Sequence, residues 1–195
     1  MRILGLDLSL QSTGYVLLDD QVLEDVVWSG RVDGSDVRDV ERLRLFDEWI
    51  RSGLKTHKPD VCAIESYAYG MPQGLTRAFS LGELGGVIKL AVAQARIPIH
   101  LIASNTWKMK LCGRGRIDKR DATMEIFKRY GVEFPSQDTL DAWAVAMTLR
   151  RQLLGLDKPA PKVKKPKAVP RSSIQNSSAA TTSTFVGATT NWWTT

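Results

Sequence analysis

Cysteine and histidine are scarce in this sequence. Its 195 residues include two cysteines, Cys62 and Cys112, and two histidines, His57 and His100. Two cysteines cannot build a disulfide framework or a zinc cluster, so a reducing cytoplasm is the expected compartment. The two histidines have no partner at metal-ligand spacing, and we expect them to be structural or solvated.

Long hydrophobic runs are also absent. No apolar stretch approaches the roughly 20 residues that a membrane-spanning helix requires. Asp7 interrupts the only early apolar segment, so we expect no signal peptide and no membrane contact. With 43% hydrophobic and 25% charged residues, the composition is that of a globular protein with a sizeable core.

Charge is plentiful, but its sign is uneven. Residues 1–65 carry eight cations and thirteen acids, whereas residues 96–129 carry nine cations and three acids. An acidic half beside a basic segment suggests a catalytic or metal centre next to a surface that binds a polyanion, although charge alone also fits a mixed solvated surface. Residues 157–195 hold six cations and one acid among many Pro, Ser and Thr residues. Such a segment cannot bury enough apolar surface to fold, so we expect a folded domain over 1–156 and a disordered, flexible basic tail over 157–195.

Hydrophobic periodicity within 1–156 predicts an α/β domain. Strand-like segments at 2–8, 13–19 and 21–32 precede an amphipathic helix from about 36 to 55, in which apolar residues recur at steps of three and four. The expected order then continues with a strand at 61–65, a helix at 75–96, a strand at 97–103 and helical segments at 104–112, 118–130 and 138–154. Three meandering strands followed by α/β crossovers describe a mixed five-stranded sheet flanked by helices.

Four acids occupy informative positions. Asp7 lies inside the first strand between two leucines, and Glu65 ends a strand directly after four apolar residues. A carboxylate at a strand position is costly to desolvate unless it is paired or binds a metal. Asp138 and Asp141 share one face of the last helix at its start. Together the four could converge on hard cations such as Mg²⁺, although Asp138 alone is more typical of a helix N-cap or first turn, and Glu65 alone fits a salt bridge equally well.

The motifs around these acids are similar to those of a known family. Segments 3–15 (ILGLDLSLQSTGY), 62–70 (CAIESYAYG), 81–93 (LGELGGVIKLAVA) and 136–147 (SQDTLDAWAVAM) resemble the RuvC family of Holliday-junction resolvases, in the ribonuclease H-like superfamily. The resemblance covers about residues 2–154 in the family's element order. Leu8-Ser9 stands where many members have Pro-Gly, and Trp143 is bulkier than usual. We therefore expect a divergent branch, such as a phage- or virus-encoded member.

This resemblance implies a ribonuclease H-like fold and a metal-dependent endonuclease. It assigns Asp7, Glu65, Asp138 and Asp141 as catalytic, metal-binding carboxylates that hold two Mg²⁺ ions, for which Mn²⁺ could substitute. The implied substrate is a four-way DNA junction, which a homodimer nicks symmetrically by phosphodiester hydrolysis.

A basic segment and a tyrosine loop are the predicted DNA contacts. Residues 107–120 contain six cations and one acid around two glycines, which let backbone approach a phosphate closely, although a solvated basic loop is the alternative. The resemblance places Lys108 and Lys119 beside the metal site as catalytic residues. It also implies that Tyr67 or Tyr69 stacks on a junction base, while at least one of them is expected to pack against the sheet edge. The full predicted DNA-binding set is Tyr67, Tyr69, Arg77, Lys108, Lys110, Arg114, Arg116, Lys119 and Arg120.

The helix at 75–96 contains Gly82, Gly85 and Gly86, each of which costs roughly 1 kcal/mol relative to Ala. Their spacing predicts one smooth face, packed either on the helix's own sheet or on a second subunit across a two-fold axis. The RuvC resemblance favours the second subunit. We therefore expect a homodimer through helix 75–96, in which Gly85→Leu weakens dimerisation more than it unfolds the subunit.

Two other functions fit the same residues. One is a ribonuclease H-like nuclease that acts on other branched DNA or on RNA–DNA hybrids, and substrate testing would distinguish it. The other is a non-catalytic DNA-binding protein that retains the fold. The presence of all four acids argues against that reading.

Overall fold

The computed structural model of the protein describes residues 1–19, 25–67 and 75–156; the predicted basic tail, 157–195, lies outside them. Five strands form one sheet in the order β3-β2-β1-β4-β5. The strands β1 (Arg2–Asp7), β2 (Ser12–Asp19) and β3 (Asp25–Asp33) make an antiparallel meander. On its other side β1 runs parallel to β4 (Val61–Ser66), which runs parallel to β5 (Ile99–Ala103). The mixed five-stranded sheet is therefore confirmed.

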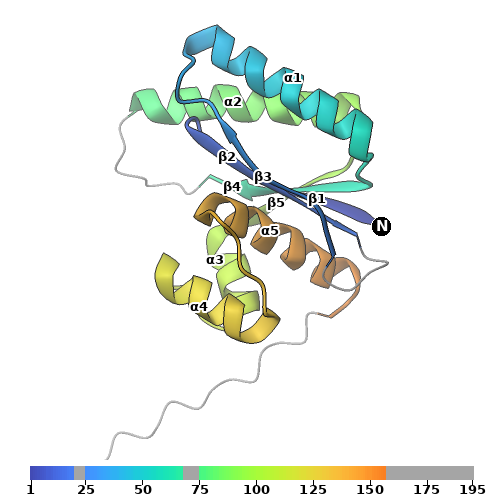
Figure 1. The fold of residues 1–195 in the computed structure, drawn as a ribbon, viewed down its shortest axis with the longest axis vertical. Helices are drawn as coiled ribbons and strands as arrows, with labels where there is room; N and C mark the ends of the chain where they lie inside the picture. Colours follow the sequence, from blue (N-terminus) through green and yellow to red (C-terminus); the bar gives the residue numbers. More distant parts are fainter. Residues whose placement is uncertain (20–24, 68–74, 157–195) are drawn as a thin grey trace, which may run out of the picture. The chain divides into compact units, whose positions relative to one another are not determined.

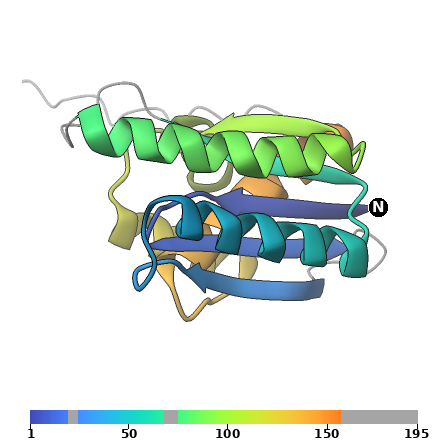
Figure 2. The ribbon, with the colours of Figure 1, turned by 90° about the horizontal axis from the view of Figure 1, so that it is seen from above.

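Helices cover both faces of this sheet (Figures 1 and 2). On one face, α1 (Asp39–His57) and α2 (Leu75–Gln94) lie side by side. The other face carries α3 (Ser104–Trp107), the π-helix η1 (Lys108–Cys112), α4 (Lys119–Tyr130) and α5 (Gln137–Leu153). None of the helices described here is long and apolar enough to cross a membrane.

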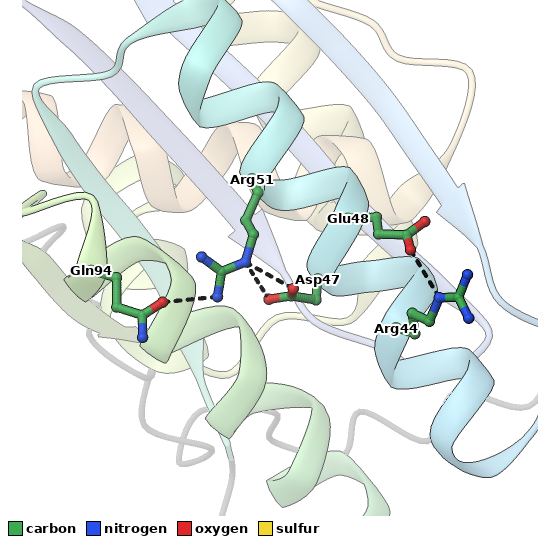
Figure 3. Close-up of polar contacts among 5 residues, drawn as sticks. All are labelled: Arg44, Asp47, Glu48, Arg51 and Gln94. Carbon is green, nitrogen blue, oxygen red and sulfur yellow. Dashed lines mark hydrogen bonds and ion pairs between the residues drawn. The ribbon is translucent and has the colours of Figure 1, made fainter.

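A polar contact links α1 to α2 at the surface of their shared layer (Figure 3). The guanidinium group of Arg51 on α1 pairs with Asp47 at 2.8 Å and donates a hydrogen bond of 2.8 Å to the Gln94 side chain of α2. Because these side chains lie at the surface, 47% and 33% exposed, the pair adds little to stability. The buried apolar residues between the two helices and the sheet hold this layer together.

Strand alternation decides which face each acid points to. In β1, Leu6 packs in the core beneath α1 and α2, while Ile3 belongs to the core on the α5 side. Successive strand residues point to opposite faces, so Asp7 shares the face of Ile3. In β4, Ala63 belongs to the α5-side core, and Glu65, two residues on, points the same way. Both strand acids therefore face α5.

The helix α5 is the most deeply placed of the helices that the structure describes. All twelve residues from Thr139 to Arg150 are buried. The bulky Trp143 is fully buried, with its ring 5.4 Å from the ring centre of Tyr130 and 6.2 Å from that of Phe134. This packing accommodates the bulky indole within the core.

Two local features differ from the sequence prediction. The first helix begins at Asp39 instead of near residue 36, because a turn precedes it in which Asp33 accepts hydrogen bonds from the amide and hydroxyl of Ser35. The predicted helix over 104–112 is a single α-helical turn followed by η1, which ends at Cys112 and is capped by Gly113 with a left-handed φ of 77°. Neither difference moves the four acids to other elements.

Candidate metal centre

Three acidic side chains from three elements meet at one end of the sheet. Asp7 ends β1, Glu65 lies one residue before the end of β4, and Asp141 belongs to the second turn of α5. Each offers a carboxylate oxygen, and these oxygens all lie within 4.8 Å of one another. β1 and β4 are parallel neighbours that end together, so Asp7 and Glu65 are adjacent. The structure thus gathers three of the four acids that the sequence singled out.

Asp138 lies one turn before Asp141 on α5 and is not among the three. It is still close enough for its negative charge to raise the pKa of Asp7. The helix N-cap is Ser136, whose hydroxyl accepts a hydrogen bond of 3.1 Å from the Thr139 amide. Asp138 is therefore a first-turn residue beside the acidic group and not the cap.

Burial and mutual repulsion oppose ionisation of these acids. Burial, followed by the charges of Glu65 and Asp141, raises the pKa of Asp7 to about 8. Burial and the charge of Asp141 raise the pKa of Glu65 to about 7, although a hydrogen bond with the Ser104 side chain acts in the opposite direction. Burial likewise raises the pKa of Asp141. Clustered carboxylates with raised pKa values are a donor set that fits a hard divalent cation, which takes oxygen ligands and would offset their repulsion.

Two lysines line the same cleft, whose volume is about 250 Å³. The Lys119 ammonium lies 3.4 Å from Oδ2 of Asp141, while its side chain remains 68% exposed. Burial is the largest single influence on Lys119 and acts to lower its pKa, but its interactions with Asp141, Asp7 and Asp138 together leave the pKa raised. Lys108 sits over the Trp107 ring, with 5.4 Å between its ammonium and the ring centre. The lining is Asp7, Leu8, Glu65, Ser66, Tyr67, Leu81, Ser104, Trp107, Lys108, Lys119 and Asp141.

The other predicted DNA contacts are placed around this cleft or outside the described part of the chain. Lys110 lies on η1, Arg114 and Arg116 on the link that follows it, and Arg120 on α4, next to Lys119. The three arginines are exposed, but none of these four residues lines the cleft. Tyr69 and the side chain of Arg77 lie outside the described residues.

Tyr67 lines the cleft and is held by α2. Its hydroxyl donates a hydrogen bond of 3.1 Å to the Leu81 carbonyl, and the Lys89 ammonium lies 5.1 Å from the centre of its ring. Sequence analysis expected at least one of the two tyrosines to pack against the sheet edge; Tyr67 is half-buried, and the contacts of its side chain described above are to α2. To stack on a DNA base, the Tyr67 ring would have to leave this position and lose that hydrogen bond.

The predicted single glycine face on α2 is wrong. Gly85 is buried against Tyr67, and a Cβ there would collide with the tyrosine hydroxyl. At Gly82 and Gly86, a Cβ would have no neighbouring atom within 4 Å. The reason is helical rotation of about 100° per residue, which turns Gly85 towards the protein interior while Gly82 and Gly86, spaced i, i+4, share the exposed face.

Sequence analysis missed three residues at this site. Ser104 bonds Glu65, Gln137 donates to Asp141, and Trp107 lines the cleft. A usable signal existed for two of them. Ser104 directly follows β5, the parallel neighbour of the Glu65 strand, and Gln137 stands four residues before Asp141 on the same helix. Trp107 carries no such signal.

The chain is similar to known proteins in both sequence and fold. Residues 3–149 match the sequence model of the family "Crossover junction endodeoxyribonuclease RuvC". The RuvC of Gloeobacter violaceus is 34% identical over 153 residues, covering 76% of this chain and 87% of that protein. The RuvC of Thermotoga petrophila is 31% identical over 156 residues, covering 75% of this chain and 90% of that protein. Thermus thermophilus RuvC in complex with a Holliday junction substrate has the same fold, with a TM-score of 0.68 at 20% identity over 82% of this chain and 99% of that one.

Proposed function

This chain belongs to the RuvC family of crossover junction endodeoxyribonucleases, and we propose that it resolves four-way DNA junctions by metal-dependent hydrolysis of phosphodiester bonds at the acidic cleft. One observation carries the proposal. Carboxylate oxygens of Asp7, Glu65 and Asp141 lie within 4.8 Å of one another in a cleft that two lysines also line. A cluster of anions beside two cations fits the binding of divalent metal and phosphate together.

In this proposal the acids hold two Mg²⁺ ions, and Mn²⁺ can replace them. Asp7, Glu65 and Asp141 supply the central ligands, and Asp138, one turn away on α5, supplies a further carboxylate. Bound cations of this kind orient the attacking water and neutralise charge that develops on the phosphate. Ile3, Ala63 and Ala142 are fully buried in the core on the same side of the sheet.

The two lysines are proposed to act on the phosphate. Lys119 is mostly exposed and lies 3.4 Å from Asp141, so it can turn its ammonium towards a phosphate oxygen when DNA enters. Lys108 lines the cleft and lies close enough to Glu65 and Asp141 to affect their ionisation. Positive charges fixed near the scissile bond stabilise the extra negative charge of the transition state.

The surrounding cations are proposed to hold the DNA backbone. Further cations near the two cleft lysines in the sequence are Lys110 on η1, Arg114 and Arg116 on the link after it, and Arg120 on α4. Contacts of this kind position a duplex without reading its sequence. Because Tyr67 is tied to α2, Tyr69 is our candidate for stacking on a junction base, with Arg77 in the first turn of α2 as a further contact.

We also propose a homodimer through α2, because a four-way junction has two equivalent strands to cut. The exposed face of α2 carries Gly82 and Gly86 between Phe79 and Leu90, which are 69% and 57% exposed. Large apolar side chains beside glycines offer a surface on which a second helix can pack closely. Both cysteines are free thiols, which suits a cytoplasmic location, that of the host if the protein is virus-encoded.

The test is cleavage of a synthetic four-way junction with Mg²⁺, beside duplex, flap and RNA–DNA hybrid controls. We expect paired nicks at the junction only. Asp7→Asn should abolish cleavage and leave junction binding intact or stronger, because the carboxylate both holds metal and repels phosphate. Cleavage by this variant within about tenfold of the parent rate would contradict the metal assignment.

The same assay separates the two alternatives. Preferential cutting of flaps or hybrids would indicate a different ribonuclease H-like nuclease. Tight junction binding with no cleavage in Mg²⁺ or Mn²⁺ would indicate a non-catalytic DNA-binding protein. The raised pKa values of the clustered acids disfavour the latter, since a scaffold gains nothing from carboxylates that repel one another.

A further inference from the structure

The two carboxylate oxygens of Asp141 have different partners. Oδ2 lies 3.4 Å from the Lys119 ammonium, and Oδ1 accepts a hydrogen bond of 2.8 Å from the Gln137 side-chain amide. The Asp141 side chain is only 6% exposed, so water has little access to it. Its orientation is therefore set by Gln137 and Lys119. Lys119 is mostly exposed, and it must move away from Asp141 if it is to contact a phosphate. Gln137 has no proposed contact with DNA, so it can keep its hydrogen bond to Asp141.

The amide of Gln137 is itself oriented from α4. Its Oε1 lies 3.1 Å from the hydroxyl of Thr123, whose single proton is shared between this oxygen and the Lys119 carbonyl at 3.0 Å. A carboxylate only accepts hydrogen bonds, so the amide must present its NH₂ group to Asp141 and its oxygen to Thr123. Only this orientation of the Gln137 amide suits both of its neighbours. The flipped amide would place oxygen against oxygen at Asp141.

Gln137 therefore bridges the basic helix α4 to a carboxylate of the acidic group. It occupies the first position of α5, after the N-cap Ser136, where the backbone is fixed by the capping hydrogen bond. The bridge runs from Thr123 on α4 through Gln137 to Asp141 on α5. Lys119, one turn before Thr123 on α4, contacts the other oxygen of the same carboxylate.

We propose that Gln137 is a positioning residue, which commits Oδ1 of Asp141 to its amide and so directs Oδ2 to the cation. This inference rests on the proposed function, because it assumes that Asp141 is a metal ligand. Hydrogen-bond partners of metal ligands fix ligand orientation, and their loss typically lowers metal affinity or activity by 10- to 100-fold. Gln137 contributes no ligand of its own and acts through Asp141.

The test compares Gln137→Met with Gln152→Met on the same helix. Methionine keeps the length of the glutamine side chain but removes its donor. Gln152 is exposed and lies near the far end of α5, so its replacement controls for the substitution itself. Three quantities are measured for the full-length chain: the half-saturating Mn²⁺ concentration in thermal shift without DNA, the same concentration for junction cleavage, and junction affinity without metal.

We expect Gln137→Met to raise both half-saturating Mn²⁺ concentrations by about tenfold, with junction affinity unchanged. Thr123→Val, which frees the amide but keeps the donor, should give a smaller shift in the same direction. A role confined to folding would lower the melting temperature without moving the Mn²⁺ dependence. Half-saturating concentrations within about twofold of those of Gln152→Met would overturn the inference while leaving the proposed function standing. A parent protein that neither binds Mn²⁺ nor cuts junctions would overturn both.

Discussion

The backbone of Asp138 at the start of α5 lies directly against Gly14 of β2, so that a Cβ on Gly14 would overlap the Asp138 carbonyl. Gly14 is also the antiparallel partner of Asp7 in the β1–β2 ladder. One glycine therefore sets the distance between the strand that carries Asp7 and the helix that carries Asp138 and Asp141. Gly5 makes a similar contact with Ala142 one helical turn further along.

We expect Gly14→Ala to lower stability by about 1–3 kcal/mol, the usual cost of forcing extra volume into a packed interior. The atoms that this Cβ would meet belong to the backbone of Asp138 and Thr139, so they cannot rotate aside. The start of α5 would have to move away from Asp7 to remove the overlap. Thermal melting should show the loss of stability, and metal-induced thermal shift should show weaker metal binding. Gly115→Ala is the control for the melts, because a Cβ at Gly115 would make only ordinary contacts at 3.5 Å. Equal melting temperatures for the two variants would refute the prediction.

The raised pKa of Asp7 predicts how stability depends on pH in metal-free protein. The folded state holds this proton up to a pKa of about 8, whereas an unfolded aspartate loses it near its ordinary value. The folded state thus binds more protons between these values, and stability falls as pH rises through that window. Glu65, whose pKa is raised to about 7, adds an effect of the same sign.

Replacing Asp7 by Asn removes the titratable carboxyl group and its contribution to the pH dependence of stability. In chelator, Asp7→Asn should be more stable than the parent at about pH 9 by at least about 1.4 kcal/mol, the equivalent of one pKa unit. The difference should shrink as the pH is lowered to about 5, where Asp7 is protonated in the folded parent. Urea unfolding at the two pH values measures it. A difference that is independent of pH would show that Asp7 ionises normally.

The two kinds of glycine on α2 predict different outcomes for substitution. Gly86→Glu places a charge on the exposed face and should weaken dimerisation without lowering the melting temperature, because a Cβ there meets no atom within 4 Å. Gly85→Leu, in contrast, should destabilise the subunit by displacing Tyr67. Sedimentation equilibrium and thermal melting distinguish these effects. A parent protein that is monomeric at micromolar concentration, with or without junction DNA, would exclude the dimer.

Removal of residues 157–195 should weaken binding to every DNA structure alike. The segment contributes six cations, and each phosphate contact that it makes adds a slope of about −0.9 to the dependence of log affinity on log salt concentration for duplex DNA. The truncated chain should therefore show a flatter salt dependence with unchanged preference for junctions over duplex. Binding titrations at several salt concentrations test this. Loss of junction preference would show that the segment reads DNA structure.

Much of the candidate site was predictable from the sequence, because it depends on local rules. Asp7 interrupts one apolar strand segment and Glu65 ends another, and a carboxylate there is costly to desolvate unless it is paired or binds a metal, so both acids stand out in the sequence. The pairing of Asp138 with Asp141 follows from the helical repeat. The motifs around these acids further indicated the family, which the comparisons confirm.

Tertiary structure decided what depends on distances between elements. The parallel pairing of β4 with β1 brings Glu65 beside Asp7, and the rotation of α5 about its axis selects Asp141 over Asp138 for the central group. The same kind of rotation on α2 turns Gly85 towards Tyr67 and leaves Gly86 exposed. The Thr123–Gln137–Asp141 bridge joins two helices, and no periodicity within either one encodes it. Sequence patterns report which face of its own element a residue occupies; how two faces meet is set by the packing of the whole core.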